Sequence, residues 1–126
     1  MSGEELYQWF EQEVKKEVPE ADSKLMLSYE PTVTPGVFLG KISLKSSPNR
    51  ALVKSDVRPE GVRMNFPVDW GDELSEWLGA PPADAYRLKS NWVHQPSIGV
   101  AVSDFEPYFK QLGAKVIEIL RRKVAA

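Results

Sequence analysis

The stretch ALVKSDVRPEGVRMNFPV, residues 51–68, decides the fold of this chain. In both halves of the stretch apolar residues alternate with polar ones, as around Lys54 in the first half and Arg63 in the second. This alternation is typical of half-buried β-strands, because successive side chains of a strand point to opposite faces of the sheet. Between the halves, residues 59–61 (PEG) have the composition of a tight turn. The stretch therefore predicts a β-hairpin with one apolar face and one polar face.

Further segments with the same alternation flank the hairpin on both sides. Proline and glycine residues separate these segments, as is usual at the ends of strands. The additional strands are expected over residues 24–29, 38–45, 86–92 and 98–102. Together with the hairpin they predict an antiparallel sheet of about five to six strands.

Amphipathic helices are predicted at both ends of the chain. Ser2 and Glu5 form a capping box that starts the first helix, and Pro19 ends it near Glu17. The last helix begins at a second capping box, which Ser103 forms with Glu106. Both helices carry an apolar stripe at helical spacing. The stripes are Leu6, Phe10, Val14 and Val18 in the first helix and Phe105, Phe109, Leu112, Val116, Ile119 and Leu120 in the last.

A shorter helix is predicted before the last pair of strands, where Asp69 or Asp72 caps a run that contains Leu74 and Trp77. The elements then follow the order α-β-β-β-β-α-β-β-α. We expect a single α+β domain over residues 1–126, in which the N- and C-terminal helices pack on the antiparallel sheet.

In size, acidity and order of elements, the chain resembles the small acidic dimeric chaperones of type III secretion. Those proteins have a helix, three strands, a helix, two strands and a helix. This chain has an extra predicted strand before its middle helix. The resemblance covers most of the chain, rests on architecture and implies a binding role of a chaperone-like kind.

The residue types of the chain exclude much of the usual catalytic chemistry. Its 126 residues contain no cysteine and a single histidine, His94. Disulfides and thiolate zinc sites are therefore excluded, and the lack of cysteine favours a reducing, cytoplasmic location. The N-terminal residues lack the pattern of a secretory signal, and no apolar run has the length of a membrane span. We expect no cofactor, no bound metal and no membrane partner.

His94 is the one candidate for acid–base catalysis, since an unperturbed histidine titrates near neutral pH. Ser97 and Asp104 would complete a nucleophile–base arrangement on paper. No nucleophile-elbow motif and no glycine-rich oxyanion loop accompany them. A histidine in a proline-containing turn is typical of a structural residue, so we assign no catalytic residue and expect that the protein is not an enzyme.

Charge is segregated along the chain, although the net charge is only −2. Strand alternation places a set of bases on the side opposite the apolar residues. The set is Lys41, Lys45, Lys54, Arg58 and Arg63. It is a candidate surface for a protein partner, a small molecule or an anionic polymer such as nucleic acid, or it is an ordinary solvent face whose lysines prevent edge pairing. No aromatic residue alternates with these bases to stack on nucleotides, which argues against nucleic acid.

An acidic and aromatic patch is predicted on one side of the middle helix. It consists of Asp69, Trp70, Asp72, Glu73 and Glu76. Carboxylates beside tryptophan suit sugar binding or paired acid–base chemistry, and four acids could hold a hard cation. No calcium-loop motif accompanies them. Acids near a helix start are common because the helix dipole favours them, so a solvated acidic face is the interpretation that we prefer.

Trp9 lies outside the apolar stripe of the first helix. Tryptophan is enriched at protein interfaces, so Trp9 is a candidate contact with a partner or a second copy. Alternatively, the helix packs along a broader face that includes it. We expect a small non-enzymatic protein-interaction or accessory module that can form a homodimer. The alternative is a domain that binds a small molecule or an anionic polymer on the basic face.

Overall fold

The computed structural model describes residues 2–67, 70, 73–74, 87–92 and 95–125. In chain order its elements are α1 (Gly3–Glu17), α2 (Ala21–Lys24), β1 (Leu25–Pro31), β2 (Phe38–Leu44), β3 (Ala51–Arg58), β4 (Gly61–Asn65), β5 (Arg87–Trp92), β6 (Gln95–Ala101) and α4 (Val102–Ala125). The strands form a six-stranded sheet in the order β1-β2-β3-β4-β6-β5, and every neighbouring pair is antiparallel. The predicted α+β class is confirmed, and the predicted order of elements is matched in part.

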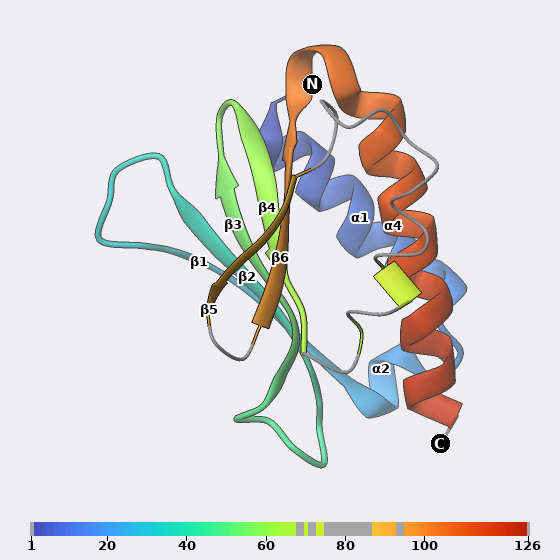
Figure 1. Cartoon of the computed structure of the whole chain (residues 1–126). Coiled ribbons are helices and arrows are strands. Elements are labelled where there is room, and N and C mark those ends of the chain that lie inside the picture. The colour runs from blue at the N-terminus through green and yellow to red at the C-terminus, as the bar shows by residue number, and fades with distance from the viewer. Residues whose placement is uncertain (1, 68–69, 71–72, 75–86, 93–94, 126) are drawn as a thin grey trace.

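The fold has two layers, as Figure 1 shows. The long helices α1 and α4 lie side by side on one face of the sheet, and no described helix covers the other face. The two predicted apolar stripes face the covered side, where Leu6, Phe10, Phe109 and Val116 are fully buried. In the part of the chain that the structure describes, no helix has both the length and the apolar character needed to cross a membrane.

The N-terminal helix begins as the sequence predicts. The backbone N–H of Glu5 donates to Ser2 Oγ at 3.2 Å, and the N–H of Ser2 donates to Glu5 Oε1 at 3.1 Å. This capping box satisfies two backbone donors that the first turn leaves without helical partners. The hydrogen bonds to Ser2 also lower the pKa of the Glu5 carboxyl.

The hairpin predicted over residues 51–68 is present as β3 and β4. Val57 lies opposite Val62 on the covered face, and Arg58 lies opposite Gly61 beside the turn. The carbonyl of Pro59 in this turn accepts from the N–H of Gly3 at 3.1 Å, so the hairpin end also holds the start of α1. The alternation that predicted the hairpin is therefore also the pattern of burial.

Three helical features differ from the sequence-based expectation or lie outside it. The one-turn helix α2 was not predicted, because four residues are too few to show a helical period. Its N-cap residue, Glu20, has a left-handed φ of 61°. Of the predicted middle helix, only Trp70, Glu73 and Leu74 belong to the described residues. The last helix begins at Val102 rather than Ser103, and the predicted cap at Ser103 lies outside the described side chains.

Candidate functional site

The uncovered side of the sheet, which we call the open face, carries most of the predicted basic set. Lys41 of β2 lies directly opposite Lys54 of β3, with no other strand between them. On the next row Arg63 of β4 lies opposite Asp56. Lys41 and Arg63 are exposed and Lys54 is half-buried.

The bases of the open face are only partly neutralised. Asp56 forms an ion pair with Arg58, whose Nε lies 3.3 Å from Asp56 Oδ2. Lys41, Lys54 and Arg63 form no ion pair in the described part of the chain. Like charges directly opposite each other destabilise a sheet, so the Lys41–Lys54 pair lowers the stability of the folded protein.

Lys45 is separated from this cluster. It follows the end of β2, and its Nζ donates to the carbonyl oxygen of Asp22 at 2.6 Å. Its backbone N–H donates to the carbonyl of Lys24 at 2.8 Å. Lys45 thus ties α2 to the sheet and does not lie with the other predicted bases.

The backbone register continues the basic rows toward the far edge of the sheet. Asn65 lies beside Lys54 and opposite Ser97 of β6, and Ser97 lies opposite Lys89 of β5. The row of Arg63 ends in the same way at Arg87. The side chains of β5 and β6 are outside the described part. Sequence reasoning missed both positions, because β4 neighbours β6 and not the strand that follows it in the chain.

Two residues of the predicted acidic and aromatic patch, Trp70 and Glu73, are described. Neither is available to a ligand, because Trp70 is buried and Glu73 is ion-paired. Trp70 is buried and stacks on Phe66, with ring centroids 5.3 Å apart. Glu73 accepts from Arg122 Nη2 at 2.7 and 2.5 Å and lies 2.9 Å from Lys115 Nζ. Hydrogen bonds from Arg122 and then Lys115 lower the pKa of Glu73 to about 2. Asp69, Asp72 and Glu76 lie outside the described residues.

Trp9 packs on α4. Its ring makes an edge contact with Phe109, with centroids 6.3 Å apart, and Lys110 Nζ lies 5.6 Å from the ring centroid. A side chain at Gly113 would meet the Trp9 ring at 3.0 Å, so this glycine permits the close approach of the helices. The half-buried position favours the broader packing face over a partner contact. A role for Trp9 in self-association stays a prediction.

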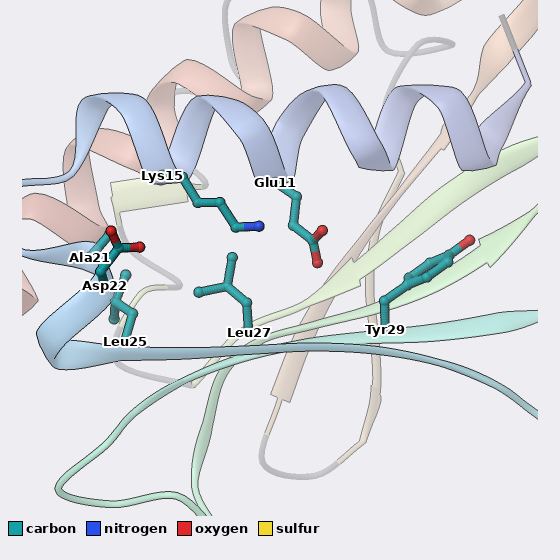
Figure 2. A pocket seen from close by; sticks show the side chains of 7 residues that line it. All are labelled: Glu11, Lys15, Ala21, Asp22, Leu25, Leu27 and Tyr29. Atoms are coloured by element: carbon teal, nitrogen blue, oxygen red, sulfur yellow. The ribbon is translucent and has the colours of Figure 1, made fainter.

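A pocket of about 320 Å³ opens between α1 and β1, and sequence reasoning missed it. Figure 2 shows Glu11 and Lys15 reaching down from α1, with Leu27 and Tyr29 rising from β1. Ala21, Asp22 and Leu25 complete the lining. Burial raises the pKa of the Glu11 carboxyl. In the sequence, only the alternation of β1 pointed to this pocket. It places Leu25, Leu27 and Tyr29 on the same face of the strand, where they line the pocket.

Aromatic rings support one end of this pocket. Tyr29 stacks between Tyr7 and Phe38, with centroid distances of 5.5 and 5.0 Å. Burial, followed by the nearby charge of Glu4, raises the pKa of Tyr29 to about 12. The Tyr29 side chain is therefore an uncharged wall of the pocket at neutral pH.

Among the residues described, no cluster of histidine, cysteine or acidic side chains could hold a metal ion. His94, the catalytic candidate of the sequence, lies outside them. Comparison with protein-family models, curated proteins and solved structures finds no match to this chain. The resemblance to type III secretion chaperones therefore gains no support from these comparisons.

Proposed function

We propose that the protein is a non-enzymatic protein-interaction module whose open face binds an acidic surface of a partner protein. The observation that carries the proposal is the Lys41–Lys54 pair, two bases held opposite each other without an acid. A carboxylate from a partner would be attracted to both ammonium groups and would relieve their repulsion. The repulsion between Lys41 and Lys54 in the free protein would thus become an attraction for a bound carboxylate.

The surroundings of these lysines favour a protein over a nucleic acid. Leu39 and Met26 contribute apolar area to the same face, and Met26 is 42% exposed. Glu30 and Asp56 on this face would repel a phosphate backbone. The described residues of the face offer no aromatic ring on which a base would stack. Mixed apolar and charged area of this kind is typical of protein interfaces.

The test begins with an affinity pull-down from the native host and continues with association rates for the captured protein. Charge reversal by Lys41→Glu with Lys54→Glu should slow association about tenfold or more at low salt, because complementary charge accelerates encounter. Added salt should slow the wild type and have less effect on the double variant. Lys16→Glu with Arg50→Glu is the matched control, since both residues are exposed and lie outside the strands of the sheet.

Two results would contradict the proposal. Association rates that ignore both salt and the Lys41→Glu/Lys54→Glu change would show that the open face is not used. Capture of nucleic acid instead of protein, lost in the same double variant, would assign the face to an anionic polymer. The folded state should survive the change, because the double variant replaces one facing pair of like charges with another, and cross-strand pairs of this kind contribute only about 0.2–1 kcal/mol.

A further inference from the structure

The loop between β1 and β2, residues 32–37, presents an apolar side chain to solvent. Val33 of this loop is fully exposed, and Met26 is the one other large apolar residue that is exposed among the described residues. A single apolar residue on a surface is ordinary. Val33 differs from such a residue in two respects, because its loop is held in shape by hydrogen bonds and lies next to the open face.

The hydroxyl group of Thr32 is at the centre of the hydrogen bonds in this loop. It donates to the carbonyl of Val37 at 2.9 Å and accepts from the N–H of Thr34 at 3.2 Å. The N–H of Thr32 also donates to the carbonyl of Val37 at 2.9 Å, which continues the ladder between β1 and β2. The loop is therefore ordered by contacts among its own residues, on both sides of Val33.

A tight turn over residues 34–37 fixes the rest of the loop. The N–H of Val37 donates to the carbonyl of Thr34 at 3.1 Å, and Gly36 has a φ of 79°. Proline at the second position and a positive φ at the third position are typical of a type II turn. Because Pro35 also restricts the backbone before binding, little conformational freedom is left for a partner to remove.

The loop lies at the end of the strands that carry the open face. Figure 1 shows it standing out from β1 and β2 on the side of the sheet away from α1 and α4. It joins β2 at Phe38, and Lys41 of the same strand lies roughly 10 Å away at about 3.3 Å per residue. A standard interface covers about 800 Å² on each partner, a patch roughly 30 Å across. One partner protein is therefore large enough to contact Lys41, Lys54 and the loop together.

We propose that this loop is a second contact for the partner of the open face, and that Val33 enters an apolar pocket of that protein beside its acidic surface. The proposal rests on the proposed function and adds a different role. Complementary charges mainly accelerate encounter, whereas an apolar side chain buried in a pocket mainly slows dissociation. Lys41 and Lys54 are therefore expected to act on kon, and Val33 on koff.

The residues around Val33 favour a protein pocket over a lipid surface. Helices and loops that insert into anionic membranes carry basic residues beside the apolar ones. Residues 32–37 contain no base, and Glu30 near the end of β1 is negatively charged. A single β-branched side chain has few rotamers, so it fits a small apolar pocket of defined shape.

Separate measurement of kon and koff tests the proposal. The probe is the host protein that immobilised wild type retains and that the Lys41→Glu/Lys54→Glu variant does not. Val33→Thr keeps the branched shape and exchanges a methyl group for a hydroxyl group. It should raise koff about tenfold, because the hydroxyl would be buried in an apolar pocket, and leave kon within about twofold.

Two features of the free protein make this variant interpretable. Val33 is fully exposed, so Val33→Thr should leave the fold intact. Thr34→Ser is the matched control, since it removes a methyl group from the next exposed side chain of the same loop. Both rates of the control should stay within about twofold of the wild type.

Thr32→Val tests whether the order of the loop matters for binding. It keeps the size of the side chain and removes the hydroxyl that joins Thr34 and Val37, so it should weaken binding about three- to tenfold. Thr32→Ser retains the hydroxyl and should bind within about twofold of the wild type. Combined with Val33→Thr, Thr32→Val should cause little further loss, because both changes act on the same contact.

The outcomes distinguish failure at the loop from failure at the open face. An unchanged koff in Val33→Thr, together with slower association of Lys41→Glu/Lys54→Glu, overturns the role of the loop and leaves the proposed function standing. If no host protein distinguishes the wild type from the double lysine variant, both proposals fall. Binding of the wild type to anionic phospholipid vesicles that Val33→Thr abolishes would assign the loop to a membrane surface instead.

Discussion

Glu73→Gln tests the ion cluster that joins the segment around Leu74 to α4. The substitution keeps the size of the side chain and removes the charge that Arg122 and Lys115 share. Lys115 is only 18% exposed at its side chain, but it keeps Glu118 as a partner at 3.4 Å. The variant therefore loses attraction without leaving a buried charge unpaired, so we expect a measurable loss of stability and an intact fold.

The size of the loss follows from the pKa of Glu73. A fall from the ordinary 4.5 to about 2 sets a ceiling of roughly 3 kcal/mol, at about 1.36 kcal/mol for each pH unit. The Glu73 side chain remains 32% exposed, and solvent screening reduces the worth of such pairs. We therefore expect the free energy of unfolding to fall by about 1 kcal/mol at pH 7.

The contribution of Glu73 to stability depends on pH, and the direction of its pKa shift sets the direction of that dependence. Because folding lowers the pKa of this acid, its contribution is complete above the unfolded value of 4.5 and is lost as the pH falls toward 2. Urea unfolding of the wild type and Glu73→Gln at pH 7, 4 and 2 should show a difference that shrinks and disappears. Glu118→Gln, which removes a single longer contact to Lys115, should cost less.

A difference between the wild type and Glu73→Gln that is as large at pH 2 as at pH 7 would refute this reasoning. It would mean that the substitution acts through packing and not through charge. A loss no greater than that of Glu118→Gln at pH 7 would show that the paired contact with Arg122 adds nothing.

Two other predictions concern the core. Phe109→Ala and Val116→Ala should lower the free energy of unfolding by about 2–5 and 1–3 kcal/mol respectively, because both side chains are fully buried; losses below about 0.5 kcal/mol in thermal or urea unfolding would contradict their place in the core. Gly40→Ala should cost about 1–3 kcal/mol, because the new Cβ would overlap Cζ and the hydroxyl oxygen of Tyr7. Unfolding curves that coincide with the wild type would show that the Tyr7 ring moves freely away from β2.

Local patterns in the sequence were sufficient for most of the described elements of the fold. The alternation around Lys54 and Arg63 predicted the hairpin, and the spacing of Ser2 and Glu5 predicted the helix start, because each pattern depends on residues a few positions apart. The helix α2 escaped prediction for the same reason, since four residues hold too little of a helical period. The class of the fold followed from the order of these local elements.

The contacts within the candidate sites could not be predicted, because they depend on which strands and helices become neighbours in the fold. Alternation placed Lys41 and Lys54 on one face, but only the register between β2 and β3 set them directly opposite each other. Lys45 obeyed the same alternation and was instead held by the carbonyl of Asp22. The residues of the candidate interface were therefore predicted in part, and their pairing was not.

By itself, the sequence determined the faces of the strands β1 to β4, the cap of α1 and the absence of cysteine chemistry. Only the tertiary structure decided that Trp9 packs on α4, that Glu73 meets Arg122, and that Glu11 and Lys15 line a pocket together with residues of β1. The physical reason is the range of the forces involved. Backbone hydrogen bonding and burial impose short periods that can be recognised along the chain, whereas the contacts of a site join residues far apart in sequence whose positions are set by packing of the whole domain.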